Sequence, residues 1–322
     1  MNFKRLVGVT AVLAIGLATA ACGGSEDETG TIRILTLPIV DDGAVFYGID
    51  SGIFKEHDVD VQIATTSGGN VGVPAMLGGS ADMVMAGPFT ALQSAAKGLP
   101  VRVVAAASTS LRESESEGDF YEVITGPDSK ITSAEELTGT TMAVNVRGGT
   151  DELYTKAFLE AHGVDPESVK LVTLPFPDKP AALLSGRIDA AIVGAPFLEG
   201  AKAEGAKTLG YPYRTQENPV NPGSYVTTVQ FAEDNPELLG RFTDALNEIV
   251  AEMEKPENRD AVLKSLSTHT GIDLDQLEGT LLPNFTPKIN MEGLREMADF
   301  GQKYGLLPEI PDLDEVVLTT AK

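Results

Sequence analysis

Leu77–Phe89 (LGGSADMVMAGPF) and Leu184–Phe197 (LSGRIDAAIVGAPF) are two copies of one pattern, and they decide the fold of this 322-residue chain. In each copy a Gly ends a helix, an Asp precedes a short apolar strand, and a turn with Pro and Phe starts the next helix. Leu, Gly, Asp and Gly recur at a constant offset of 107 residues. One repeat of this length is not a solenoid, so the echo predicts two similar lobes.

Strand-like and helix-like segments alternate outward from both copies. The expected strands are residues 32–37, 59–64, 82–86, 101–107, 141–146, 169–174, 190–194 and 207–209. The expected helices are residues 44–56, 72–78, 89–97 and 152–161, and the chain is helical again after residue 231. The alternation predicts an α/β fold with mainly parallel sheets flanked by helices. Ligands of such sheets bind past the carboxyl ends of the strands, so two facing lobes predict a cleft there.

The N-terminus has the features of an export signal. Two basic residues precede a short apolar stretch of small residues that ends at Cys22. This pattern predicts a lipoprotein signal peptide over residues 1–21, with Cys22 acylated as the first mature residue. The alternative is an ordinary secretory signal cut near Ala20 or Ala21. Residues 22–30 contain no apolar run and are expected to form a flexible acidic tether.

Composition excludes several classes of protein. The formal net charge of −23 argues against nucleic-acid binding, which requires basic surfaces. Cys22 is the only Cys, so no intramolecular disulfide can form. The three His residues have no partners at metal-ligand spacing, and phosphate-binding or nucleophile motifs are absent from the sequence. We therefore predict no metal, no cofactor and no enzymatic activity.

Four stretches in this order and spacing resemble the nitrate/taurine/sulfonate-type periplasmic binding proteins, the SsuA/TauA or thiamine-precursor-binding-like group. They are Gly52–Asn70, Met76–Ala106, Glu136–Pro175 and Ala182–Phe197. The resemblance implies a two-lobed periplasmic-binding-protein fold of type II, with two crossover segments as a hinge and a small-molecule ligand between the lobes. Lobe one would comprise residues 31–126 plus 225–322, and lobe two residues 127–224.

The same resemblance implies the partners and the location of the protein. The ligand would pass to an ABC permease with a cytoplasmic ATPase, and the lipid anchor would hold a monomer on the outer face of the cell membrane, or the protein would be periplasmic in a Gram-negative cell. An extracellular sensing module also needs two lobes that enclose a ligand, so a sensing role without transport remains an alternative. An enzymatic relative of this fold uses a Cys-rich motif with an iron site, which the single Cys of this chain cannot supply.

Candidate ligand residues follow strands or open helices. In lobe one we expect Asp41, Asp42, Ser67, Gly68, Gly69, Asn70, Gly87, Phe89 and Thr90, with Tyr225 at the second crossover. In lobe two we expect Arg147, Gly148, Gly149, Thr150, Pro196 and Phe197. Glycines let backbone N–H groups approach a ligand, and helix starts favour negative charge. The plainer alternatives are ordinary turns, Asp41 or Asp42 as a helix cap, and Arg147 in solvent. Asp82 and Asp189 precede strands and are expected to be structural.

These residues favour a small organic anion or zwitterion. Its acid group would lie near Arg147 and Thr150, and Asp41 or Asp42 would take an amine at the other end. The competing hypothesis is an uncharged heterocycle, such as a vitamin precursor, stacked near Phe89 or Phe197.

Overall fold

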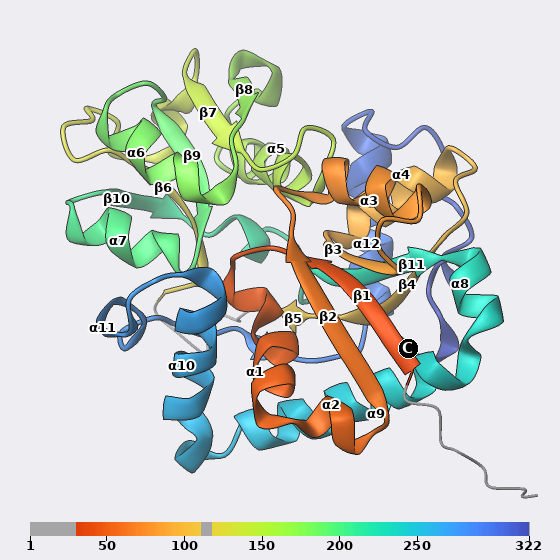
Figure 1. Ribbon diagram of the computed structural model, residues 1–322. Helices are drawn as coiled ribbons and strands as arrows, with labels where there is room; N and C mark the ends of the chain where they lie inside the picture. The colour runs from red at the N-terminus through yellow and green to blue at the C-terminus, as the bar shows by residue number, and fades with distance from the viewer. Residues whose placement is uncertain (1–29, 111–117, 322) are drawn as a thin grey trace, which may run out of the picture.

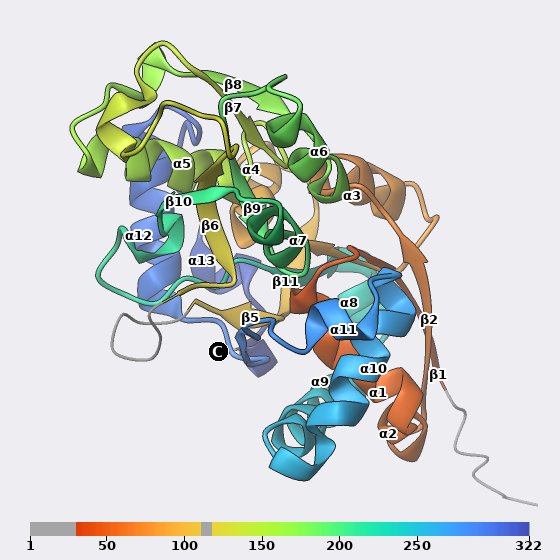
Figure 2. The same cartoon turned by 90° about the vertical axis from the view of Figure 1, so that its left-hand side faces the viewer.

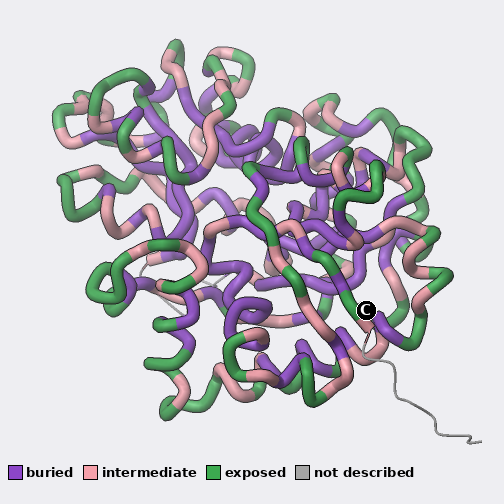
Figure 3. The backbone as a smooth tube through the Cα atoms, viewed as in Figure 1, coloured by how far each residue is buried: buried purple, intermediate pink, exposed green. Residues whose placement is uncertain are grey.

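The computed structural model describes residues 30–110 and 118–321 and contains two five-stranded sheets with helices around each (Figure 1). The predicted signal peptide, Cys22 and residues 22–29 of the predicted tether lie outside the described residues. Each lobe is an α/β unit, a sheet flanked by helices, as the alternation of segments predicts. Buried residues are concentrated on the inner strands of the two sheets, and exposed residues gather on the outer loops, the helix faces and parts of the edge strands (Figure 3).

The first sheet has the strand order β2-β1-β3-β11-β4. Its strands are β1 (Gly30–Thr36), β2 (Val59–Thr65), β3 (Met83–Ala86), β4 (Val101–Ala106) and β11 (Ser224–Thr228). Strand β1 pairs in parallel with β2 and β3, while β11 runs antiparallel to β3 and β4.

The second sheet has the order β10-β6-β9-β7-β8 and repeats this plan. Its strands are β6 (Tyr121–Thr125), β7 (Thr141–Val144), β8 (Lys170–Thr173), β9 (Ala190–Gly194) and β10 (Lys207–Gly210). Strand β7 pairs in parallel with β8 and β9, while β6 runs antiparallel to β9 and β10. In each sheet the antiparallel strand is the one that arrives by a crossover from the other sheet.

The two crossovers are paired with each other. Strand β5 (Ser108–Thr109) leaves the first sheet and pairs with β12 (Asn284–Phe285). The Ser110 N–H donates to the Val220 carbonyl, and the Val220 N–H donates to Ser110 Oγ at 3.0 Å. Strand β6 belongs to the second sheet, whereas the predicted lobe boundary lies after residue 126. A boundary placed before residue 119 would put β6 in lobe two, together with the other strands of its sheet. The lobe boundaries themselves stay a prediction.

The helices flank both sheets. They are α1 (Gly43–Ser51), α2 (Ile53–Glu56), α3 (Gly69–Leu77), α4 (Pro88–Ala96), α5 (Thr150–Ala161), α6 (Lys179–Leu184), α7 (Phe197–Ala203), α8 (Val229–Asp234), α9 (Pro236–Met253), α10 (Arg259–Thr270), α11 (Leu274–Leu277), α12 (Met291–Lys303) and α13 (Leu313–Val316). The helix expected over 44–56 is two helices, because Gly52 adopts φ +84° between them. Helix α12 lies against both α4 and α5, and therefore touches both lobes (Figure 2).

The two copies of the repeated sequence pattern make equivalent hydrogen bonds in the two sheets. The Asp82 carboxylate accepts the Arg33 N–H of β1 at 2.8 Å, and the Asp189 carboxylate accepts the Thr141 N–H of β7 at 2.8 Å. Each Asp thus continues the register between two parallel strands, which confirms the structural role expected for both.

No helix within residues 30–110 and 118–321 is long and apolar enough to cross a membrane. The same part of the chain holds no group of three His, Cys, Asp or Glu side chains arranged to bind a metal ion.

Candidate functional site

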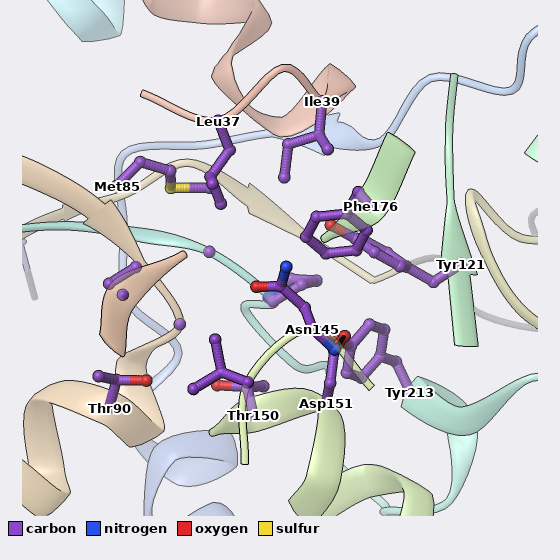
Figure 4. Close-up of a pocket in the computed structure, with 16 residues that line it drawn as sticks. Leu37, Ile39, Met85, Thr90, Tyr121, Asn145, Thr150, Asp151, Phe176 and Tyr213 are labelled. Carbon is purple, nitrogen blue, oxygen red and sulfur yellow. Dashed lines mark hydrogen bonds between the residues drawn. The ribbon is translucent and has the colours of Figure 1, made fainter. Parts of the chain in front are cut away.

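A cavity of about 40 Å³ lies between the two sheets, past the carboxyl ends of β1, β3, β7 and β8 (Figure 4). This is where ligands of open α/β sheets bind. Its walls come from both sheets and from the second crossover. The lining residues are Leu37, Ile39, Gly69, Met85, Ala86, Gly87, Thr90, Tyr121, Asn145, Val146, Thr150, Asp151, Phe176, Tyr213, Pro222 and Gly223.

One end of the cavity is formed by helix starts. Helices α3, α4 and α5 begin beside it, at Gly69, Pro88 and Thr150, and none of the three has a side-chain cap. The first-turn N–H groups of such helices carry partial positive charge. Thr150 is 5% exposed, and its Oγ1 is buried without a hydrogen-bond partner. This helix end of the cavity is therefore polarised to receive an acceptor oxygen.

The opposite end is aromatic. The Tyr121 ring centroid lies 5.1 Å from that of Tyr213, edge to face, and 6.0 Å from that of Phe176. Both tyrosine hydroxyls donate to buried carboxylates: Tyr213 to Asp151 Oδ1 at 2.8 Å, and Tyr121 to Asp41 Oδ2 at 3.0 Å. We call Tyr121, Phe176 and Tyr213 the aromatic end.

Two adjacent carboxyl groups lie behind the first-lobe wall. Asp42 accepts the Leu37 N–H at 2.7 Å and the Tyr225 hydroxyl at 2.9 Å, so it fixes the chain where β1 ends. Asp41 accepts the Ser108 hydroxyl as well as that of Tyr121. Burial raises the pKa of Asp41 to about 6 and the pKa of Asp42 to about 8. Neither side chain caps α1, in contrast to the simplest expectation.

Asp151 is the second-lobe counterpart of Asp42. It accepts the Asn145 N–H just past β7 at 3.0 Å, and the Tyr213 hydroxyl binds its other oxygen. It also has a cationic partner, because the fully buried Lys179 Nζ lies 3.3 Å from Asp151 Oδ2 and donates to the Ile192 carbonyl at 2.8 Å. The two lobes thus anchor the loops after β1 and β7 in the same way.

Of the residues predicted to bind ligand, Gly69, Gly87, Thr90 and Thr150 line the cavity. Asp41 and Asp42 lie one layer behind it. Whether any of these residues contacts a ligand stays a prediction.

Arg147 does not line the cavity. Its Nε lies 2.8 Å from Glu152 Oε2, and its NH1 donates to the Leu171 carbonyl at 2.8 Å. The Arg147 side chain is 52% exposed, whereas that of Glu152 is 2% exposed, so the guanidinium neutralises a buried carboxylate in the first turn of α5. Gly148, at φ +74°, turns this loop and faces Gln93 of α4, and Gly149 precedes α5.

The first-lobe loop of residues 67–70 contacts the second lobe. The Ser67 carbonyl accepts Asn145 Nδ2 at 3.1 Å, and a Cβ on Gly68 would lie 2.9 Å from Asn145 Oδ1. Asn70 is exposed. These residues hold the two lobes together beside the cavity, and Gly69 alone among them faces into it.

The predicted aromatic residues lie elsewhere. Phe89 is fully buried against Gly301, and Tyr225, a residue of β11, is fully buried as well. Pro196 and Phe197 line a separate apolar groove of about 560 Å³ between α6, α7 and the α11 segment. Their places at the wall of the cavity are taken by the aromatic end.

The predicted site residues do not include Tyr121, Asn145, Asp151, Phe176 or Tyr213, all of which line the cavity. Asn145 lies near the end of the predicted strand 141–146, and Phe176 comes two residues after the predicted strand 169–174. Asp151 follows β7 much as Asp42 follows β1, so a signal existed for these three. Tyr121 lies on β6, and Tyr213 lies in a short turn. Neither segment is among the predicted strands and helices, so the hydrophobic pattern of the sequence gave no indication of these two residues.

The chain matches a family model described as NMT1/THI5 like over residues 41–259. The putative binding protein YtlA of Bacillus subtilis (strain 168) is 22% identical over 250 residues, which covers 76% of this chain and 73% of YtlA. These matches bear out the resemblance seen in the four sequence stretches.

Solved structures share the fold. The alkanesulfonate-binding protein SsuA from Xanthomonas axonopodis pv. citri, bound to MOPS, has a TM-score of 0.75 at 17% identity, with 90% of this chain and 98% of that chain covered. The desulfurization enzyme DszB has a TM-score of 0.63 at 17% identity, with 89% and 96% covered. The two-lobed fold is thereby confirmed, and it occurs in both binding proteins and an enzyme.

Proposed function

The chain belongs to the NMT1/THI5-like family, and from this premise we propose that it is an extracytoplasmic solute-binding lipoprotein that captures a small organic anion or zwitterion between its lobes and delivers it to an ABC importer. In this proposal Cys22 carries the lipid anchor on the outer face of the cell membrane. The partners are the ABC permease and its cytoplasmic ATPase, and the protein acts as a monomer.

The helix end of the cavity carries the proposal. Three helix starts converge there, and the unpartnered Thr150 hydroxyl lies among them. Backbone N–H groups and a hydroxyl form a suitable cradle for a carboxylate or sulfonate, since the dipoles of all three helices favour negative charge. Arg147 is not needed for this, because its guanidinium already pairs with Glu152.

Binding rather than catalysis fits the chemistry of the cavity wall. In the described part of the chain, neither Cys, His nor Ser lines the cavity. Asp151 is held by Lys179, the Tyr213 hydroxyl and a backbone N–H, so it has no free role as a base. We therefore propose a receptor, with ligand sensing without transport as its nearest alternative.

The uncharged heterocycle remains a second candidate ligand because one observation favours it. Three aromatic rings line the cavity at the aromatic end, and flat rings stack favourably on such walls.

The test is to identify the ligand and then remove one hydroxyl. Mass spectrometry of the soluble chain from residue 23 onward identifies what co-purifies, and calorimetry compares it with Thr150→Val. Loss of a hydrogen bond to a charged group costs about 1.5–3 kcal/mol, or roughly tenfold to over a hundredfold in affinity. Thr268→Val, on the exposed face of α10, is the matched control and should bind like the parent. If the affinity of Thr150→Val falls by less than about threefold, the uncharged heterocycle becomes the favoured ligand class in place of the anion.

A further inference from the structure

The apolar groove of about 560 Å³ beside α6, α7 and the α10–α11 segment is a surface feature that ligand capture does not use. Figure 2 shows these helices one above another on the same side of the molecule. Only Glu204 and Gln276 among the lining residues are polar; the others are apolar side chains and one Gly. Apolar hollows of this kind at a protein surface commonly mark interaction sites. We call this feature the interlobe groove.

The walls of the interlobe groove come from both lobes. Helices α6 and α7 pack on β9 of the second sheet. Ile272 and Gln276 belong to the α10–α11 segment, and α10 packs on α1 of the first lobe. Because α11 meets α7 across the boundary between the lobes, the groove has this shape only while the lobes are together.

Two loops separate the interlobe groove from the ligand cavity. In the first loop Phe176 lines the cavity, and the next residue, Pro177, lines the groove. In the second loop the Ala195 carbonyl accepts the Val40 N–H of the first lobe at 3.3 Å, and the next residue, Pro196, lines the groove. These loops therefore connect the cavity and the contact between the lobes to the wall of the groove.

Acidic side chains surround the apolar floor. Glu204 lines the groove just after α7. Asp273, Asp275 and Glu278 are exposed along the α11 segment, which forms the opposite wall. Stable interfaces combine an apolar centre with a polar rim, and the charge of the rim selects a partner of opposite charge. The rim of this groove thus selects a basic partner.

The cations of the three helices do not offset this charge. Within α6, α7 and α11 the only basic residues are Lys179 and Lys202. Lys179 is buried against Asp151, and the Nζ of Lys202 lies 2.6 Å from Glu122 Oε1. A second copy of this chain has a net charge of −23, and an anionic lipid surface is also negative, so the rim repels both.

We propose that the interlobe groove is the docking surface for the permease of the importer, which inserts a short apolar segment flanked by Lys or Arg residues. This deepens the proposed function and rests on it, since it names the surface that receives the partner. The apolar side chains of the segment occupy the floor between Phe197 and Ile272, and its flanking cations reach Glu204 and the acidic groups of the α11 segment. The permease thereby recognises both lobes in their closed arrangement.

The experiment maps the contact by photocrosslinking. The chain from residue 23 onward has no Cys, so one introduced Cys carries a benzophenone label at a single known position. Ala203→Cys places the label in the groove, and Ser80→Cys, in an exposed bend outside the groove, is the matched control. Each labelled chain is irradiated on membranes of the source cells, and mass spectrometry identifies the captured protein and the crosslinked peptide. We expect Ala203→Cys to capture an ABC permease through an apolar peptide next to Lys or Arg, and Ser80→Cys to capture none above background.

Substitutions in the Ala203→Cys background test the chemistry of the groove. Glu204→Lys reverses a rim charge and should lower the yield of crosslinked permease by about threefold or more. Glu233→Lys, exposed in α8 on the opposite side of the molecule in Figure 1, is its matched control and should leave the yield unchanged. Ala181→Arg puts an unpaired charge on the apolar floor and should lower the yield by about tenfold or more. Thermal unfolding should match the parent for all three variants, because each replaced side chain is exposed.

The outcomes separate this inference from the function on which it rests. As much permease captured by Ser80→Cys as by Ala203→Cys, or an unchanged yield in Glu204→Lys and Ala181→Arg, overturns the groove as the docking surface and leaves the importer as the partner. Capture of a second copy of the chain or of lipid at Ala203→Cys, in place of a permease, overturns it as well. If neither Cys position captures an ABC permease, delivery to an importer fails together with the docking surface, and sensing takes its place.

Discussion

Gly87 is the position at which one methyl group should act as a wedge between the lobes. A Cβ built on Gly87 would lie 2.1 Å from Thr150 Oγ1 and 2.8 Å from Thr150 Cβ. Gly87 belongs to the first-lobe turn before α4, and Thr150 opens α5 in the second lobe. Gly87 itself has φ −63° and ψ 140°, a conformation open to every residue, so Gly87→Ala adds steric conflict without backbone strain.

The size of the effect follows from this overlap. Real Cβ contacts are never this short, and overpacking a tight contact by one methyl typically costs about 1–3 kcal/mol. The cost falls on the closed form alone, because separation of the lobes frees the space. Ligand affinity should therefore drop by roughly fivefold to over a hundredfold.

Calorimetry with the co-purified ligand measures the affinity, and small-angle scattering measures whether the ligand still reduces the radius of gyration. Gly240→Ala in α9 is the matched control, since a Cβ there meets no atom within 4 Å. It should stabilise the fold by about 0.5–1 kcal/mol and leave affinity unchanged. Parent-like affinity and a parent-like contraction in Gly87→Ala would refute the idea that this contact limits closure.

Four further changes have definite expected results. Arg147→Ala should alter ligand affinity by less than about threefold in calorimetry, because its guanidinium is bound to Glu152 of α5 and to the Leu171 carbonyl and does not line the cavity. Lys179→Met should lower the free energy of unfolding in urea by about 3–5 kcal/mol, since it leaves the buried Asp151 without its cation. Burial raises the pKa of Asp42 from 3.8 to about 8, so the folded chain holds a proton that the unfolded chain releases. Stability should thus fall as pH rises from 4 to 8, and Asp42→Asn should lessen that fall in urea titrations at pH 5 and pH 8. Finally, intact-mass analysis of the membrane fraction should find Cys22 acylated; an unmodified thiol on a freely soluble chain would contradict this.

The repeated pattern was enough to predict two similar α/β lobes. Asp82 and Asp189 continue strand registers in the two sheets, as their positions before apolar strands indicate. Helix starts with Gly, such as those at Gly69 and Gly87, were predictable as well, because local backbone chemistry places them at strand ends. Periodicity and turn residues are local properties, and sequence alone determines them.

The composition of the cavity wall was decided by tertiary structure. Tyr121 and Tyr213 reach the wall from the crossover strand β6 and from a turn that no periodic pattern indicates. Arg147 pairs with Glu152 of α5, and Phe89 packs into the core against Gly301; both outcomes depend on neighbours that spacing does not specify. Sequence determined which loops lie at the strand ends, whereas the packing of one lobe against the other decided which side chains line the cavity, because burial and charge pairing are settled only when distant segments meet.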